Sequence, residues 1–364
     1  MLHFTVYTDH PDVDTVVRAD LDFLSASLRQ AYPAIQALIL VGGFGRGEGG
    51  VLLEGGRIRP VNDYDLIMVT ADRVDRDELR SVRLKLAESL SVTWVDITPR
   101  SPAVLRRLPV TMYNYDLKYG SYVLYGDPTI LDQIPPMDPA LIPLVEAELQ
   151  FFTRLWCFLG PFKLDYLTHP PDAEARFFLN NQMSKAVLAC ADAFLILDGL
   201  YHHSYRERRD RCLRLYGDRT PLAELLRWAA EFKLRPALNI EREPAALWRT
   251  VRQVFLETWQ EFNRNRYWRF DGNWQTYARR FVWNQFNLLR RAGHLIVRRS
   301  LHYERKLKVD LAQLYLLLAF DGEREDVMWL AKAKGKLGTV TGRGLATLTW
   351  DETRALAATL RMDV

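Results

Sequence analysis

Two aspartates separated by a single residue are the part of the sequence with the clearest capacity for chemistry. Asp63 and Asp65 flank Tyr64 at the start of an apolar run, which predicts a buried strand over 64–69. Because residues two apart on a strand leave the same face, both carboxylates can share a pair of divalent cations. Carboxylates in a buried strand are costly unless a metal ion or a cationic partner compensates them. The pair therefore predicts a cation site.

A third carboxylate lies on the next predicted strand. Residues 92–98 alternate in polarity, and Asp96 stands there between two apolar residues. Adjacent strands are close enough for Asp96 to join the same site. Oxygen ligands without a nearby histidine or cysteine favour Mg²⁺, or Mn²⁺, over zinc. We therefore expect Asp63, Asp65 and Asp96 to be metal ligands.

Glycines follow the first predicted strand, which covers 37–41. Gly42 and Gly43 allow backbone N–H groups to approach a phosphate, and Arg46 can add a charge-assisted contact. This is not a G-x-G-x-x-G dinucleotide turn, because no acidic residue ends a second strand at the right distance. It is not a Walker A loop, because no Gly-Lys-Ser/Thr follows. The three residues are candidate phosphate ligands.

Short elements of both kinds must position these residues. Tyr32-Pro33 ends the first expected helix, and Pro99 ends the last expected strand. The order of helix, strand, turn, strand, helix and strand predicts a small α/β domain. The expected elements are a helix from Val16 to Leu28, strands over 37–41, 64–69 and 92–98, a hairpin or projecting loop over 51–59 around Gly55-Gly56, and a helix over 77–90.

From about Pro135 onwards, long helical patterns replace strand-like alternation. A boundary is expected near 134–136, which gives one domain over 1–134 and a second over 135–364. The expected fold class is α+β, with a small mixed-sheet domain followed by an all-helical domain. Turns are expected at 160–161, 170–171 and 335–344. Helices are expected over 139–160, 174–199, 204–216, 221–233, 245–265, 274–303, 309–319, 324–334 and 351–361.

Composition narrows the class of protein. The 364 residues are 48% hydrophobic and 26% charged, which is typical of a folded globular chain and excludes a disordered or low-complexity one. Its 49 basic and 45 acidic residues give a net charge of +4, too small to indicate nucleic-acid binding by itself. Three widely spaced cysteines, no signal peptide and no apolar run long enough for a bilayer favour a cytoplasmic protein without a membrane partner.

In combination, these pieces resemble the polymerase-β-type nucleotidyltransferase superfamily. The resemblance rests on Gly42-Gly43 after one strand, Asp63-Tyr64-Asp65 on the next and Asp96 on the third. The resemblance is strongest to the bacterial signal-protein uridylyltransferases and their relatives. It lies in the motif Gly-Gly-Phe-Gly-Arg-Gly-Glu followed by Asn-Asp-Tyr-Asp-Leu. The likeness covers roughly residues 36 to 127. The gap between Gly43 and Asp63 is longer than is usual in the family, and a projecting hairpin accounts for the excess.

The resemblance implies metal-dependent transfer of a nucleoside monophosphate from an NTP, such as ATP, to an acceptor hydroxyl, with release of pyrophosphate. Asp63 and Asp65 would hold both Mg²⁺ or Mn²⁺ ions, Asp96 would complete the site of the metal that activates the acceptor, and the three would be the catalytic residues. The loop from Gly42 would hold the β- and γ-phosphates. Phosphoryl transfer needs positioning and charge neutralisation, which such a site supplies. The alternative is that the aspartates cap a loop and the glycines form a tight turn.

Two lysines are further candidates for contact with the nucleotide. Lys118 lies in the segment 115–127, which resembles the end of the same domain in antibiotic-modifying members of the superfamily, and it could touch a phosphate. Lys185 lies in a helical part that loosely resembles the domain following the catalytic domain in kanamycin-type nucleotidyltransferases. In those proteins this domain closes over the nucleotide. A solvated surface lysine is the alternative at both positions.

The acceptor stays open at this point. Between 264 and 308, twelve basic residues alternate with aromatic ones against two acidic residues, a pattern that suits RNA, although a core-facing helix with arginines outside has the same spacing. The acceptor could therefore be a small molecule, a protein side chain or an RNA or tRNA 3′ end. A non-catalytic nucleotide- or RNA-binding protein is the alternative from another class. The sequence does not indicate an oligomeric state.

Overall fold

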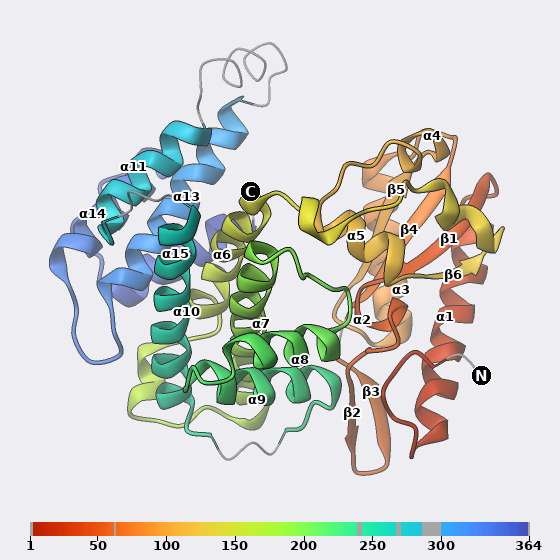
Figure 1. Ribbon diagram of the computed structural model, residues 1–364, viewed down its shortest axis with the longest axis horizontal. Helices are drawn as coiled ribbons and strands as arrows, with labels where there is room; N and C mark the ends of the chain where they lie inside the picture. The colour runs from red at the N-terminus through yellow and green to blue at the C-terminus, as the bar shows by residue number, and fades with distance from the viewer. Residues whose placement is uncertain (1–2, 62, 239–241, 267–270, 286–299, 363–364) are drawn as a thin grey trace. The chain divides into compact units, whose positions relative to one another are not determined.

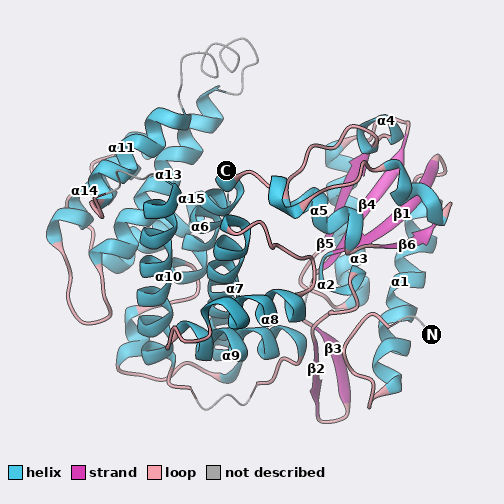
Figure 2. Ribbon diagram, viewed as in Figure 1, coloured by secondary structure: helices cyan, strands magenta, loops and turns pink. Residues whose placement is uncertain are grey.

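The computed structural model describes residues 3–61, 63–238, 242–266, 271–285 and 300–362 (Figure 1). Its architecture is α+β, as the sequence predicts: a four-stranded mixed sheet in the N-terminal part is followed by a part that is mostly helical (Figure 2). The elements are α1 (Pro11–Ala31), β1 (Ile35–Val41), α2 (Gly42–Gly45), β2 (Val51–Glu54), β3 (Arg57–Pro60), β4 (Tyr64–Thr70), α3 (Arg76–Leu90), β5 (Val95–Arg100), α4 (Pro102–Leu105), α5 (Met112–Tyr119), β6 (Tyr122–Tyr125), η1 (Pro128–Gln133), η2 (Pro139–Leu141), α6 (Leu144–Leu159), η3 (Leu164–Leu167), α7 (Ala173–Leu197), α8 (Tyr205–Tyr216), α9 (Leu222–Leu234), α10 (Pro244–Arg266), α11 (Trp274–Gln285), α13 (Ser300–Ala319), α14 (Val327–Thr341) and α15 (Trp350–Met362).

The four-stranded sheet has the order β5-β4-β1-β6. Strand β1 is antiparallel to both of its neighbours, and β4 is parallel to β5. The prediction that Pro99 ends the last strand is wrong, because β5 continues through Pro99 to Arg100. Strand β5 is the outermost strand, and an edge position tolerates proline because the missing N–H can fall on the unpaired side.

Strand β6 is an element that the sequence patterns did not predict. It pairs with β1, with Tyr122 opposite Leu40 and Tyr125 opposite Leu38. Its four residues are all half-buried, so they show no alternation between an apolar and a polar face. Such a short edge strand is defined by its partner rather than by its own sequence.

One face of the sheet packs on helices α1 and α3, and this packing forms the core of the N-terminal part. The helical spacing of α1 buries five of its apolar side chains, and α3 adds Leu79 and Leu86. These helices cover the alternate strand residues, among them Leu38, Leu66 and Ile97. Strands β2 and β3 form a separate hairpin, as predicted, with a turn at Gly55-Gly56 (Figure 2).

The chain divides into two compact units. The first contains Met1–Glu146 together with Leu195–Leu238, and the second contains Ala147–Phe194 together with Asn239–Val364. Helices α8 and α9 therefore belong to the same unit as the sheet, whereas the sequence patterns assign them to a helical domain over 135–364. The sheet-bearing unit holds every residue of the candidate site described below except Lys185.

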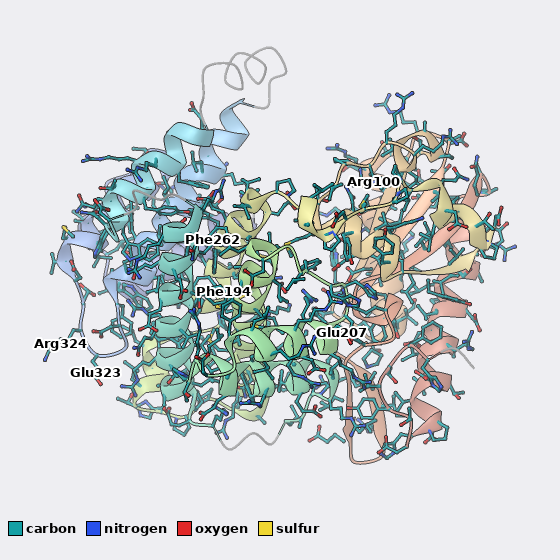
Figure 3. The ribbon with its side chains drawn as sticks, in the orientation of Figure 1. Arg100, Phe194, Glu207, Phe262, Glu323 and Arg324 are labelled. Carbon is teal, nitrogen blue, oxygen red and sulfur yellow. The ribbon has the colours of Figure 1, made fainter. Side chains whose placement is uncertain are left out.

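The second unit is helical and is built around buried aromatic side chains. Trp248, Trp259 and Tyr277 are fully buried in it, as are Phe194 and Phe262, which are labelled in Figure 3. The predicted turn over 335–344 is wrong over 335–341, because α14 runs through two glycines to Thr341. Burial of an apolar face of α14 outweighs the helix-breaking tendency of glycine there.

No helix in the described part of the chain is long and apolar enough to cross a membrane.

Candidate active site

Asp65 and Asp96 are neighbours on adjacent strands. They are directly opposite each other in the parallel register of β4 and β5, so their side chains leave the same face of the sheet. The residue before Asp65 shows which face this is: Tyr64 is fully buried and donates a hydrogen bond of 2.7 Å to Asp20 on α1. By alternation along β4, Asp65 is directed to the face opposite α1. Burial, and the nearby Asp20 carboxylate, raise the pKa of Tyr64.

Gly42 brings the glycine turn into contact with Asp65. Its backbone has φ +69°, in the left-handed region, and a Cβ built on it would lie 2.5 Å from Oδ2 of Asp65. Val41, the preceding residue, is paired with Asp65 across β1 and β4. The first glycine of the turn and the carboxylate of β4 are therefore packed against each other, and only glycine leaves room for that carboxylate. Gly43 follows in the single turn of helix α2 and is buried.

Asp63 lies directly before β4 and is exposed. Both Asp63 and Asp65 make interactions within the chain. The structure therefore places Asp65 beside Asp96 and Gly42, with Asp63 two residues away at the start of the strand. The sequence predicted this grouping of a glycine turn with strand carboxylates.

Asp96 also has a cationic neighbour. The Nη2 atom of Arg83, on α3, contacts Oδ1 of Asp96 in an ion pair. Arg83 Nε donates to the carbonyl of Val95 at 3.3 Å, and its guanidinium lies 5.4 Å from the centroid of the Trp94 ring. Burial lowers the pKa of Arg83. The sequence analysis did not predict this partner, because Arg83 is one of several charged residues in the expected helix over 77–90.

Tyr113 and Arg100 extend the neighbourhood of Asp65. Tyr113 is the second residue of α5, and Arg100, labelled in Figure 3, is the last residue of β5. Burial raises the pKa of the Tyr113 hydroxyl; the charge of Arg100 lowers it, and the charge of Asp65 raises it. An aromatic hydroxyl and a guanidinium therefore share the electrostatic surroundings of this carboxylate. No sequence pattern singled out either residue.

The donors fit a hard divalent cation in their chemistry, since they are carboxylate oxygens with no nitrogen or sulfur ligand among them. The register of Asp65 and Asp96, and the packing of Gly42 on Asp65, also fit such a site. In the described residues, however, no three His, Cys, Asp or Glu side chains come together closely enough to hold a metal ion. Asp96 contacts Arg83 instead.

Arg46, a predicted phosphate ligand, lies inside the sheet-bearing unit. Its Nη1 atom donates to Oδ2 of Asp116 at 3.0 Å and to the carbonyl of His203 at 2.9 Å, and its guanidinium lies 4.7 Å from the centroid of the Tyr205 ring. The side chain is only 6% exposed. The structure thus places Arg46 among residues of α5 and of the segment before α8.

Glu48 caps the N-terminus of helix α8. Its Oε1 atom accepts hydrogen bonds from the Ser204 hydroxyl at 2.7 Å and from the Arg206 backbone N–H at 3.2 Å, and its Oε2 atom accepts one from the Tyr205 N–H at 2.7 Å. A carboxylate at this end of a helix satisfies N–H groups that have no partner within the helix, and it is favoured by the helix dipole. Glu48 and Arg46 together fasten the segment after the glycine turn to α8 and α5.

A buried polar network continues from Arg46. Asp116 accepts a hydrogen bond from the hydroxyl of Tyr201 at 3.0 Å, and Arg208 donates to the same hydroxyl at 3.3 Å. Burial raises the pKa of Asp116, and the charges of Arg46 and Arg208 act against that rise. The Asp116 carboxylate therefore contacts one buried guanidinium group, that of Arg46, and is linked to a second, that of Arg208, through the Tyr201 hydroxyl.

His203 is neutral inside this network. Burial, together with the neighbouring His202 and the surrounding arginines, lowers its pKa to about 4. The rings of His202 and His203 are stacked with centroids 4.2 Å apart. A neutral imidazole next to Arg46 and Arg208 avoids a third positive charge around Asp116.

The two predicted lysines belong to different units. Lys118 Nζ donates to the carbonyl of Leu131 at 2.7 Å and lies 3.8 Å from Oδ1 of Asp132, so it contacts the η1 segment of the sheet-bearing unit. Lys185 lies on α7 within the helical unit and is half-buried.

The basic and aromatic stretch over 264–308 contributes to the helical core where it is described. Trp274, Tyr277 and Phe281 are buried, and Arg266 pairs with the buried Glu148. Phe281 stacks on Phe152 of α6, with centroids 4.1 Å apart. These aromatic residues face the core, as expected for an amphipathic helix. Residues 267–270 and 286–299 lie outside the described part of the chain.

Comparisons with models of protein families, with curated proteins and with solved structures gave no match to this chain.

Proposed function

We propose that this protein is a metal-dependent nucleotidyltransferase, which moves a nucleoside monophosphate from an NTP to an acceptor hydroxyl and releases pyrophosphate. The observation that carries the proposal is the meeting of three separate segments at one point: Gly42 packs on Asp65, and Asp65 stands beside Asp96 in the parallel register. A glycine turn that can approach phosphates is thereby joined to carboxylates that can approach metal ions.

Each group has a proposed role. Asp63, Asp65 and Asp96 would hold Mg²⁺ or Mn²⁺, which when bound supplies charge neutralisation for the triphosphate. The N–H groups from Gly42 and Gly43 would bind phosphate oxygens. Arg46 and Glu48 hold this turn through their contacts with Asp116, His203 and the start of α8, so that it needs no rearrangement when the nucleotide binds.

The acceptor in this proposal is a small molecule or a protein side chain. RNA was suggested by the stretch over 264–308, and three of its aromatic residues are buried in the helical core and are not available to stack on bases. A cytoplasmic location fits the proposal, because all three cysteines are free, as is usual for proteins in a reducing compartment.

A non-catalytic nucleotide-binding protein is a second candidate, and the contact of Asp96 with Arg83 favours it. An NTP could still bind at Asp65 and the glycine turn if Asp96 were not available for catalysis. The two candidates differ in whether the bond between the α- and β-phosphates breaks.

The test is incubation of the purified protein with each of the four α-³²P-labelled NTPs and Mg²⁺, with and without cell lysate. A D63A/D65A double variant is the matched control. Label that moves onto an acceptor, and does not move in the variant, supports nucleotidyl transfer and identifies the acceptor class. Retained NTP binding without any transfer would contradict the enzyme and support the nucleotide-binding protein.

A further inference from the structure

Arg83 is anchored to β5 at the position of the proposed third metal ligand. All of its contacts described above are with three consecutive residues at the start of that strand: the ring of Trp94, which directly precedes β5, the carbonyl of Val95 and the carboxylate of Asp96. Helix α3 packs on β5, and β5 is the outermost strand of its sheet. Arg83 therefore reaches Asp96 from the helix that covers the other face of the sheet.

We infer that Arg83 and a divalent cation compete for the carboxylate of Asp96, so that Arg83 sets the affinity of the metal site. This inference rests on the proposed function, because it takes Asp96 to be a metal ligand. A guanidinium in contact with Oδ1 occupies a lone pair that the metal would use, and a cation beside the site repels a second cation. The contact of the guanidinium with Asp96 therefore opposes binding of a metal ion to this carboxylate.

The pair is weak enough for a metal ion to displace. The Asp96 side chain is 46% exposed, and ion pairs between partly exposed side chains are screened by water. Arg46 is different, since its side chain is 6% exposed and it is enclosed by Asp116, the His203 carbonyl and Tyr205. Of these two arginines, Arg83 is therefore the one whose partner can be exchanged, while Arg46 keeps its partners.

The experiment measures Mn²⁺ binding without nucleotide, from the electron paramagnetic resonance signal of the free ion. Binding at the site is defined as the part that D63N/D65N abolishes. We expect Arg83→Gln to tighten Mn²⁺ binding about fivefold, the change that corresponds to losing one exposed ion pair. Arg80→Gln is the matched control, because Arg80 is an exposed residue of the same helix. The Mn²⁺ affinity of this variant should stay within about twofold of wild type.

Asp96→Asn tests whether the effect passes through this carboxylate. In an Asp96→Asn background, the added Arg83→Gln change should alter Mn²⁺ affinity no more than Arg80→Gln does, because no carboxylate remains to compete for. Thermal unfolding of each variant shows that it is folded before its affinity is compared.

The outcomes separate the two proposals. Mn²⁺ binding that depends on Asp63 and Asp65 but is unchanged or weaker in Arg83→Gln overturns the competition and leaves the proposed function standing. A tightening of equal size in the Asp96→Asn background also overturns it, since the effect would then come from the general field of the arginine. If neither wild type nor Arg83→Gln shows Mn²⁺ binding that depends on Asp63 and Asp65, both the competition and the proposed function are overturned.

Discussion

The carboxylate of Glu48 lies at the start of helix α8, where it accepts the backbone N–H of Tyr205 at 2.7 Å. The two residues are far apart in the sequence, yet this contact and those to Ser204 and Arg206 fix the segment after the glycine turn against α8. The proposed phosphate-binding turn is therefore held by a capped helix that follows it by more than 150 residues.

Glu48→Ala should destabilise the sheet-bearing unit by about 3 kcal/mol. The change leaves the first N–H groups of α8 without a buried acceptor and removes a favourable interaction with the helix dipole. Urea unfolding followed by circular dichroism measures the loss. Glu54→Ala is the control, because Glu54 is exposed on the β2–β3 hairpin, and its effect should stay within about 0.5 kcal/mol. Equal losses in the two variants would contradict the capping role of Glu48.

Gly42→Ala should abolish nucleotidyl transfer and destabilise the protein more than Gly55→Ala does. Both glycines have positive φ, +69° and +54°, so both substitutions bear a left-handed backbone cost of about 1 kcal/mol. Only at Gly42 does the new Cβ meet a carboxylate, that of Asp65, since nothing lies within 4 Å at Gly55. Activity assays and thermal unfolding of the two variants isolate the contact with Asp65. Full activity in Gly42→Ala would contradict the proposed site.

Stability should fall as the pH drops from about 6.5 to about 4, and His203 should contribute to that fall. Its pKa is lowered to about 4 in the folded protein, from 6.5, so in this pH range the unfolded chain binds the proton more readily. The contribution of His203 to the free energy of unfolding is complete above pH 6.5 and is lost as the pH approaches 4. His203→Asn should therefore flatten the difference in unfolding free energy between pH 7 and pH 5. An unchanged difference in His203→Asn would contradict this contribution of His203.

Tyr277→Phe should destabilise the helical unit by about 1 to 3 kcal/mol. The Tyr277 hydroxyl donates a hydrogen bond to Oε1 of the buried Glu148 at 2.8 Å and accepts one from Trp259 Nε1 at 3.2 Å. Removal of the hydroxyl therefore takes one hydrogen-bond partner from each of these two buried polar groups. Tyr166→Phe, at a half-buried tyrosine, serves as the control for loss of a hydroxyl. A thermal unfolding profile that is the same for both variants would show that the hydroxyl of Tyr277 carries no such stabilisation.

The sequence predicted the parts of the fold that local patterns control. Strands β1 and β4 are continuous apolar runs, and the hairpin has its glycine pair at the turn, so their positions follow from nearby residues. The neighbouring positions of Asp65 and Asp96 also follow, because they depend on two strands being adjacent. Strand β6 has no such pattern, and α14 contains glycines that indicate a turn, so both depend on their partners in the fold.

The surroundings of the site could not be predicted in the same way. Arg46 looked like a phosphate ligand because it follows the glycines, but its hydrogen-bond partners are 70 and 157 residues further along the chain. Arg83 contacts Asp96 from a helix whose many charges gave no reason to select one of them. Contacts between residues distant in sequence decide which charged side chains are internal, and a single sequence carries no record of them.

The division of the sheet-bearing unit into two stretches of chain has a consequence for biosynthesis. Residues 195–238 are synthesised only after the stretch 147–194 of the other unit, and they include His203, one of the partners of Arg46, and the α8 residues that Glu48 caps. A nascent chain that has emerged only as far as residue 146 would leave Glu48 without the N–H groups of α8, and would leave Arg46 with Asp116 but without the His203 carbonyl. The unit would then complete its fold late, when α8 emerges from the ribosome, and a fragment cut at residue 134 would lose the contacts with α8 that help to fasten its glycine turn.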